Sequence, residues 1–201
     1  DMPRTTEQYE ELRNEKKQFI ANIALKLFAN QGYTKTSISL IAKEAKMSKG
    51  LLYNYFQNKK ELLEYIINSL AEDTSQYIDP NKDGIITEEE ALDFIDITFD
   101  MLKERRESLK YYYQLAFQPE IKEIFFNPNL LSENIKKQQD LFYDFWVSKF
   151  PNVNPKIARA NIFAFVKGFV MLYVHFPEMY PDEFLEEYKV YLKKFITNQT
   201  K

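Results

Sequence analysis

Basic and aromatic side chains between residues 34 and 60 have the types and the spacing that suit contact with nucleic acid. From Lys26 to Lys60 the chain holds seven lysines and one acid, Glu44. The first 60 residues carry 11 basic and 6 acidic side chains, whereas residues 61–201 carry 16 and 24. Lysine binds phosphate through its charge, while tyrosine and asparagine can reach base edges. A basic segment in an otherwise acidic chain is expected where that segment alone meets DNA.

A second group of side chains, at residues 79–90, has the spacing of a calcium-binding loop. The segment DPNKDGIITEEE matches the twelve-residue EF-hand loop, in which Gly84 makes the sharp turn. The oxygen ligands would come from Asp79, Asn81, Asp83, the Ile85 carbonyl and Glu90. The loop is solitary, whereas EF-hand loops usually occur in pairs, and the same residues make a good turn between helices. The sequence therefore allows calcium here without requiring any cofactor.

Helices must position the basic side chains, and the apolar spacing predicts two helices before residue 46. One apolar stripe with a period of 3.6 residues is formed by Ile20, Ile23, Ala24, Leu27 and Phe28. Gly32 follows as a natural left-handed stop. Thr36 or Ser37 can N-cap the next helix. The inner face of that helix holds Ile38, Ile41, Ala42 and Ala45.

A third helix follows the turn at residues 46–48 and carries the candidate DNA-contacting side chains. We expect it over Lys49–Phe56, with Ser48 as its N-cap. Such a helix is too short to be stable alone, so Leu52 and Phe56 must pack inward. The side chains left outside are then Lys49, Gly50, Tyr53 and Asn54. Two helices joined in this way form a helix-turn-helix, whose second helix enters the major groove of DNA.

The remaining chain is expected to be helical as well, which makes the fold class all-α. Further helices are predicted over residues 59–77, 88–105, 108–118, 131–149, 155–176 and 182–197, with prolines between them. We therefore predict a three-helix DNA-binding domain over residues 1–58 and a larger helical domain over residues 59–201. The chain has no cysteine, which excludes disulfides and thiol chemistry.

Several short runs at matching spacing point to one protein family. They are Leu27-Phe28, Gly32-Tyr33, Thr36-Ser37, Ile41-Ala42, Ser48-Lys49-Gly50, Leu52-Tyr53, Tyr55-Phe56 and Lys59-Lys60-Glu61-Leu62. Over about residues 14–65 the chain resembles the DNA-binding domain of TetR-family transcriptional regulators, with Lys46 and Met47 as departures in the turn. The resemblance and the outward side chains together predict DNA contacts, including a phosphate held by Lys59. The predicted contacts are Thr36, Ser37, Lys46, Ser48, Lys49, Gly50, Tyr53, Asn54, Tyr55 and Lys59.

This resemblance implies a dimeric repressor that leaves a palindromic operator in double-stranded DNA when a small effector binds. In the family, the last two large helices pair with the same helices of a second subunit, where Gly168 would permit close approach. Residues 155–176 are apolar around most of the predicted helix, which therefore needs cover on several sides. The body of the chain is rich in Phe and Tyr, so we expect an apolar or amphipathic effector.

Other classes of function find less support. His175 is the only histidine and no glycine-rich phosphate loop occurs, so we expect no enzyme. The polar N-terminus and the short apolar run Phe169–Phe176 lead us to expect a cytoplasmic protein with no membrane partner. Two alternatives stay open: a calcium-responsive regulator that uses residues 79–90, and a helical lipid-binding protein or enzyme with a vestigial DNA-binding head.

Overall fold

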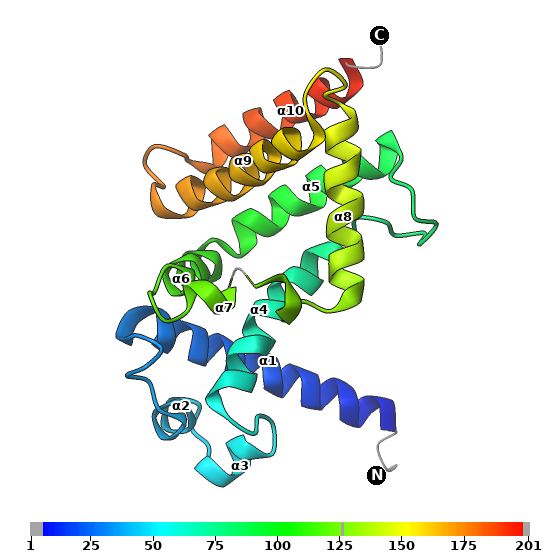
Figure 1. Cartoon of the computed structure of the whole chain (residues 1–201). Coiled ribbons are helices and arrows are strands. Elements are labelled where there is room, and N and C mark those ends of the chain that lie inside the picture. The colour runs from blue at the N-terminus through cyan, green and yellow to red at the C-terminus, as the bar shows by residue number, and fades with distance from the viewer. Residues whose placement is uncertain (1–5, 126, 199–201) are drawn as a thin grey trace. The chain divides into compact units, whose positions relative to one another are not determined.

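A computed structural model describes residues 6–125 and 127–198, and those residues form helices without any β-strand, as the sequence predicts (Figure 1). The helices are α1 (Thr6–Gln31), α2 (Ile38–Glu44), α3 (Lys49–Tyr53), α4 (Lys59–Ser75), α5 (Glu88–Glu104), α6 (Arg106–Ala116), α7 (Lys122–Phe125), α8 (Glu133–Ser148), α9 (Pro155–His175) and α10 (Asp182–Asn198), with a 3-10 turn at Pro128–Leu130. The expected helices are all present, whereas the single turn α7 was not predicted.

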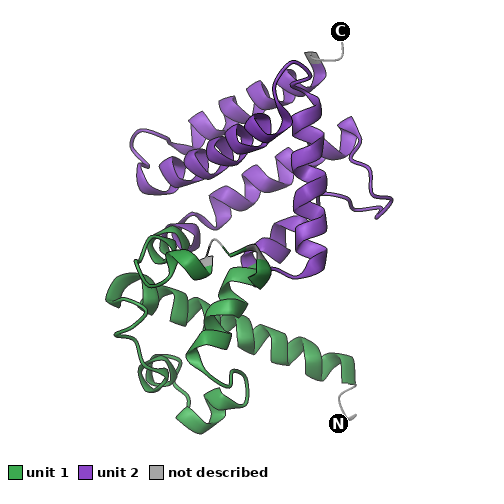
Figure 2. Ribbon diagram, in the orientation of Figure 1, with its two compact units in different colours: residues 1–69, 111–130 green, residues 70–110, 131–201 purple. Residues whose placement is uncertain are grey.

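The chain forms two compact units, shown in separate colours in Figure 2. One unit contains residues 1–69 and 111–130, and the other contains residues 70–110 and 131–201. Helices α4 and α6 each run from one unit into the other. Compactness thus divides the chain differently from the expected domains at residues 1–58 and 59–201, and a functional boundary after residue 58 stays a prediction.

The first unit is held together by the apolar faces that the sequence indicates. Fully or almost fully buried side chains on α1 to α4 include Ile20, Ala24, Phe28, Ile41, Leu52, Phe56, Leu62 and Leu63. Burying a side chain of the Leu, Ile or Phe type contributes about 1.5–3 kcal/mol. Phe28 also meets the edge of the Tyr33 ring, with the ring centroids 5.0 Å apart. The short α2 and α3 are therefore fixed by tertiary packing on α1 and α4 rather than by their own propensity.

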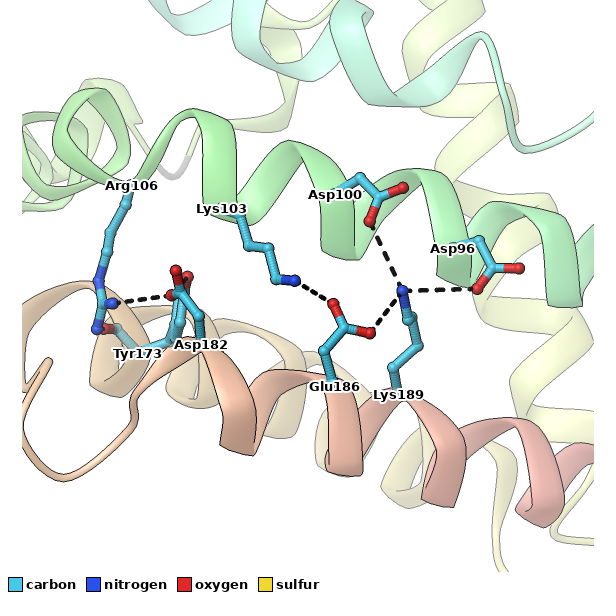
Figure 3. A network of polar contacts seen from close by, with 8 residues as sticks. All are labelled: Asp96, Asp100, Lys103, Arg106, Tyr173, Asp182, Glu186 and Lys189. Atoms are coloured by element: carbon cyan, nitrogen blue, oxygen red, sulfur yellow. Dashed lines mark hydrogen bonds and ion pairs between the residues drawn. The ribbon is translucent and has the colours of Figure 1, made fainter.

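The second unit packs α5 along α10 and α8 along α9. Figure 3 shows the charged side chains between α5 and α10, where Lys189 reaches Glu186 at 3.0 Å and Asp100 at 3.6 Å. Lys103 pairs with the other oxygen of Glu186. At the end of this row, Arg106 donates to the backbone carbonyls of Tyr173 and Tyr180, at 2.6 and 3.0 Å. These contacts fix the register of α5 against α10.

Helix α9 is the most apolar element of the second unit and leaves much of its surface open. Large side chains exposed on it include Ile157, Phe163 and Phe165. By length and composition alone α9 could cross a membrane, and 22% of its most apolar window is buried. One such helix is weak evidence for a membrane span, since mostly buried core helices meet the same criteria. The low burial of α9 shows that much of its apolar surface is uncovered within the described chain.

Tyr173 makes the stability of this unit sensitive to alkaline pH. Its side chain is fully buried, and its hydroxyl donates a hydrogen bond of 2.7 Å to Asp182. Burial first, and then that hydrogen bond, raise the pKa of Tyr173 to about 12. The value in the unfolded chain is about 10, so the neutral form contributes stability that is complete below about pH 10 and is lost as the pH rises toward 12.

We therefore expect the free energy of unfolding to fall more steeply between pH 10 and 12 in the wild type than in Tyr173→Phe. At neutral pH the variant should be less stable by about 1 kcal/mol, because it lacks the hydrogen bond to Asp182. Urea unfolding at several pH values measures both effects, with Tyr9→Phe as the control because Tyr9 is exposed. Parallel curves for wild type and Tyr173→Phe would contradict the assignment.

Candidate nucleic-acid interface

The helix-turn-helix is built by two serine caps and a left-handed turn. The Ser37 hydroxyl accepts a hydrogen bond from the Leu40 N–H at 3.1 Å, and Ser48 does the same for Leu51 at 3.1 Å. Both serines thus begin a helix, as their positions in the sequence predict. Lys46 adopts φ +53° in the turn between α2 and α3, a region that favours glycine. The backbone of Lys46 is therefore strained, and its side chain is exposed.

Helix α3 presents one polar face to solvent and buries the other. Leu52 is fully buried, whereas Lys49 and Gly50 are exposed and Tyr53 keeps 43% of its surface open. The Lys49 ammonium lies 5.9 Å from the centroid of the Tyr53 ring. The other predicted contacts with open side chains are Ser37, Lys46, Ser48 and Asn54, while Tyr55 is half-buried. Six of these residues, Lys46 to Asn54, are therefore brought together at the turn and on α3.

Leu51 is an exposed residue of α3 that the sequence did not single out. It lies between Gly50 and the buried Leu52 and keeps 42% of its surface open. An apolar side chain at this place can contact a thymine methyl group in the major groove. Little in the sequence indicates that Leu51 is exposed, because a leucine next to a buried leucine is easily taken for a second core residue.

Thr36 and Lys59, both predicted to contact DNA, make hydrogen bonds inside the protein. Thr36 is 1% exposed and its hydroxyl donates to the Gly32 carbonyl at 2.9 Å, so it closes the end of α1. The Lys59 ammonium donates to the carbonyls of Tyr33 at 2.8 Å, Thr36 at 3.0 Å and Thr34 at 3.3 Å. It also lies 4.3 Å from the centroid of the Tyr33 ring.

These contacts join the start of α4, where Lys59 lies, to the segment between α1 and α2. An ammonium group has three N–H donors, and all three are directed to backbone carbonyls here. Burial lowers the pKa of Lys59. In this arrangement the Lys59 donors support the α1–α2 connection, so a phosphate contact would require Lys59 to leave a carbonyl, and that contact stays a prediction. Its partners lie 23–26 residues away in the sequence, so no local pattern indicates them.

Gln118 and Glu120 hold the same connection from the segment after α6. The Gln118 amide donates to the Phe28 carbonyl at 2.7 Å and accepts from the Tyr33 N–H at 2.8 Å. The Thr34 hydroxyl donates to Glu120 at 2.9 Å. Hydrogen bonds from its own backbone and from Thr34 lower the pKa of Glu120. Residues 33–36, which lead into α2, are thus tied to α4 by Lys59 and to the turn after α6 by Gln118.

The loop at residues 79–90 is closed by its own hydrogen bonds. Asp79 is 3% exposed and accepts from the N–H groups of Asp83 and Gly84, at 3.2 and 3.0 Å. Glu90 accepts from both the N–H and the hydroxyl of Thr87 at 2.9 Å, a capping box that begins α5. The Asp79 carboxylate thus stabilises the turn, and the Glu90 carboxylate caps α5. Glu90 would have to leave Thr87 to bind an ion.

Within the described ranges, no group of three or more His, Cys, Asp or Glu side chains lies close enough together to hold a metal ion. Of the expected ligands, Asn81 and Asp83 bond to each other at 3.2 Å, and Ile85 is exposed. Asp79 and Asn81 both accept from the Asp83 N–H, at 3.2 and 2.9 Å, so these three expected ligands lie close together, whereas Glu90 is bonded to Thr87. Calcium binding by this loop stays a prediction.

Known proteins match this chain over the helix-turn-helix. Residues 20–66 match the family described as bacterial regulatory proteins, tetR family. YuxN, an uncharacterized HTH-type transcriptional regulator of Bacillus subtilis (strain 168), is 52% identical over 54 residues, which are 27% of this chain and 19% of that protein. The HTH-type transcriptional regulator HbdR of Aromatoleum sp. (strain CIB) is 38% identical over 74 residues, which are 37% and 32% of the two chains. The chain therefore spans about a fifth to a third of the curated relatives that it matches.

The fold as a whole is also shared with a solved structure. A transcriptional regulator from Aquifex aeolicus VF5 has a TM-score of 0.61 and 26% sequence identity, covering 90% of this chain and 98% of that one. These matched proteins are transcriptional regulators rather than enzymes, in agreement with the expectation from the sequence. The chain thus has an all-helical fold that it shares with a solved transcriptional regulator, and residues 20–66, which contain the helix-turn-helix, match the model of the tetR family.

Proposed function

We propose that this chain is a transcriptional regulator that binds double-stranded DNA as a homodimer, and that it is a repressor released from a palindromic operator by a small apolar or amphipathic effector. The observation that supports this proposal most directly is the polar face of α3. Lys49, Gly50 and Tyr53 are open to solvent there, while Leu52 and the following Phe56 are buried. A capped, short, outward-facing helix of this kind fits the major groove. The match of residues 20–66 to the tetR family supports the same reading.

The contacts with DNA divide into two kinds. Lys46 stands exposed in the turn before α3, so we assign it a phosphate contact in place of Lys59. Tyr53 and Asn54 lie on the exposed face of α3 and are the candidates for base edges. Replacing Tyr53 should then relax sequence preference, while replacing Lys46 should weaken all sequences alike.

Selection of binding sites from random duplex DNA tests the proposal, because no operator is assumed. We expect a palindromic sequence with half-sites one helical turn or more apart, as two copies of α3 require. The affinity for it should fall steeply with salt, with log K decreasing by about 0.9 per phosphate neutralised for each tenfold increase in salt. A selection that recovers no sequence, together with binding insensitive to salt, would refute DNA binding.

A substitution at Gly50 can distinguish an effect on DNA binding from an effect on the stability of the fold. A Cβ added at Gly50 would meet nothing within 4 Å among the described atoms, and its φ is not left-handed. Glycine in a helix costs about 0.5–1 kcal/mol relative to alanine, and nothing in the described chain requires it at this position. Close approach of DNA to the backbone would explain the glycine.

Gly50→Ala should therefore keep or slightly raise thermal stability and yet weaken operator binding by about tenfold. Gel-shift titration and thermal unfolding of the same preparation measure the two effects. Gln31→Ala, at an exposed position of α1 outside the predicted contacts, is the control for a change to alanine in a helix. Unchanged affinity in Gly50→Ala would show that DNA does not approach this point of α3.

The uncovered face of α9 supports the proposed homodimer. Ile157, Phe163 and Phe165 are exposed on α9, and Val190 and Tyr191 are exposed on α10. Exposed large apolar side chains on neighbouring helices are typical of interaction surfaces. A second copy of the same helices would cover them, in agreement with the dimer expected from the sequence.

Effector binding would act on α4 and on the segment around Gln118. Helix α4 is continuous from the helix-turn-helix unit into the second unit, and Gln118 ties the turn after α6 to the α1–α2 connection. Binding of effector and DNA would be reciprocally coupled, typically by about 1–3 kcal/mol. Apolar compounds that raise the melting temperature should release the selected operator, and stabilisation without release would refute this mechanism. A regulator acting on DNA in this way would work in the cytoplasm, with no membrane partner.

The calcium-responsive alternative makes a different prediction. Calcium would have to draw Glu90 from Thr87, so calorimetry should detect binding in the wild type and lose it in Glu90→Gln. Equal heats for both proteins would dismiss the metal. The other alternative, a helical lipid-binding protein or enzyme with a vestigial head, predicts little binding to duplex DNA at any salt concentration.

A further inference from the structure

The end of α3 is held by a residue far from it in the sequence. Helix α3 has five residues and therefore little stability of its own. Ser48 caps its beginning, but its last residues depend on what they touch. The Arg13 guanidinium, 41 residues earlier on α1, donates to the Asn54 carbonyl at 2.8 Å. Asn54 is the C-cap of α3, where the carbonyl groups are the negative end of the helix dipole.

The same guanidinium makes a second contact with this segment. Its central carbon lies 5.3 Å from the centroid of the Tyr55 ring. One turn along α1, the Lys17 ammonium lies 5.5 Å from the centroids of both Phe56 and Tyr65. Arg13 and Lys17, one helical turn apart on α1, are thus placed over residues 54–56, directly after the face that is open to solvent.

We infer that Arg13 is a positioning residue for sequence readout, which orients the end of α3 and thereby the side chains of Tyr53 and Asn54. This inference rests on the proposed DNA binding for its functional consequence, while the contact itself lies within one compact unit. Arg13 would influence DNA binding through α3, because its guanidinium donates to the Asn54 carbonyl and lies over the Tyr55 ring. A planar guanidinium can stack flat on a ring while its N–H groups donate in their own plane, a geometry that the compact lysine ammonium does not reproduce.

Hydrogen exchange of the free protein tests the contact without any DNA. The N–H groups of Asn54 and Tyr55 donate to Leu51 and Leu52, at 3.2 and 2.9 Å. Arg13→Ala should accelerate exchange of these amides. Lys16→Ala is the matched control, because it removes the same charge from α1 where the ammonium lies over Phe19. Equal exchange in the wild type and Arg13→Ala would overturn the inference.

Binding to the selected operator tests the consequence. Arg13→Ala should weaken it by about fivefold, the loss expected from one exposed hydrogen bond and one cation–π contact, with nonspecific binding and the salt slope unchanged. Arg13→Lys should behave like Arg13→Ala. Recovery of affinity in Arg13→Lys, or an equal loss in Lys16→Ala, would instead identify a simple charge effect and overturn the positioning role. A wild type that binds no duplex would refute the proposed function, whereas the exchange result would still decide on the contact.

Discussion

In the proposed homodimer, Gly168→Leu is expected to separate the two copies without harming the fold of each. A Cβ added at Gly168 meets nothing within 4 Å among the residues that the structure describes, so one chain has room for a larger side chain. Glycine within a helix costs about 0.5–1 kcal/mol relative to alanine. Within one protomer, no contact of the described residues requires a glycine at this position of α9. Close approach of a second copy would supply the reason, because Ala160 and Ala164 precede Gly168 at one-turn intervals and are exposed.

A leucine at this place would be present twice in a symmetric interface, once from each protomer. Overpacking typically costs about 1–3 kcal/mol for each site, so we expect the dimer dissociation constant to rise by at least about 30-fold. Operator binding should fall with it, because two copies of α3 are needed for a palindrome. Sedimentation equilibrium measures the first effect and gel-shift titration the second.

Lys137→Leu is the matched control, since Lys137 is exposed on α8 and the change adds similar apolar bulk away from α9. The control should remain dimeric and should bind DNA like the wild type. A Gly168→Leu protein with an unchanged dimer dissociation constant would show that this face of α9 is not the interface. A wild type that is monomeric, or that stays in solution only with detergent, would contradict the homodimer itself.

Gln118→Leu is expected to destabilise the helix-turn-helix unit by about 2 kcal/mol. The side chain satisfies two backbone groups at once, the Phe28 carbonyl and the Tyr33 N–H. Leucine has a similar size but no polar atoms, so the Tyr33 N–H would lose its partner and the Phe28 carbonyl would keep only the Gly32 N–H, at 3.1 Å. Leaving a buried backbone group unpaired costs about 1–3 kcal/mol, and the partial exposure of this place reduces that cost.

Gln114→Leu is a demanding control, because it makes the same chemical change one turn earlier on α6. The Gln114 Oε1 is buried and has no hydrogen-bond partner among the described residues. Removing an unpaired buried oxygen should be neutral or stabilising. Urea unfolding of both variants should thus give changes of different size or sign. Equal destabilisation would mean that the amide contacts of Gln118 contribute nothing beyond side-chain volume.

The Gln118 variant should also bind the operator less tightly than its stability alone explains. Residues 33–36 lead directly to Ser37, the N-cap of α2, so freeing Tyr33 loosens the support of the helix-turn-helix. Lys59 would still hold the Tyr33 carbonyl, and some order would therefore remain. Titration of the operator at a temperature where both variants are fully folded isolates this effect from global unfolding.

Local features of this protein were determined by the sequence itself. Ser48 begins α3 and Thr87 begins α5, because an N-cap bonds to an N–H only two or three residues ahead. The inward positions of Leu52 and Phe56 follow from helical periodicity, which needs only the order of apolar residues. The predicted third helix nevertheless extended to Phe56, whereas α3 ends at Tyr53. Its end depends on contacts from α1 that periodicity does not contain.

The roles of individual polar side chains were decided only by the tertiary structure. Lys59 has the appearance of a phosphate ligand in the sequence, yet three carbonyls from residues 33–36 occupy its donors. Gln118 and Arg13 carried no signal, since their partners lie 85–90 and 41 residues away. A long polar side chain can reach many partners, and which one it finds depends on helices brought together by packing. Sequence patterns report periodicity and caps over a few residues, whereas such pairings exist only once the chain has folded.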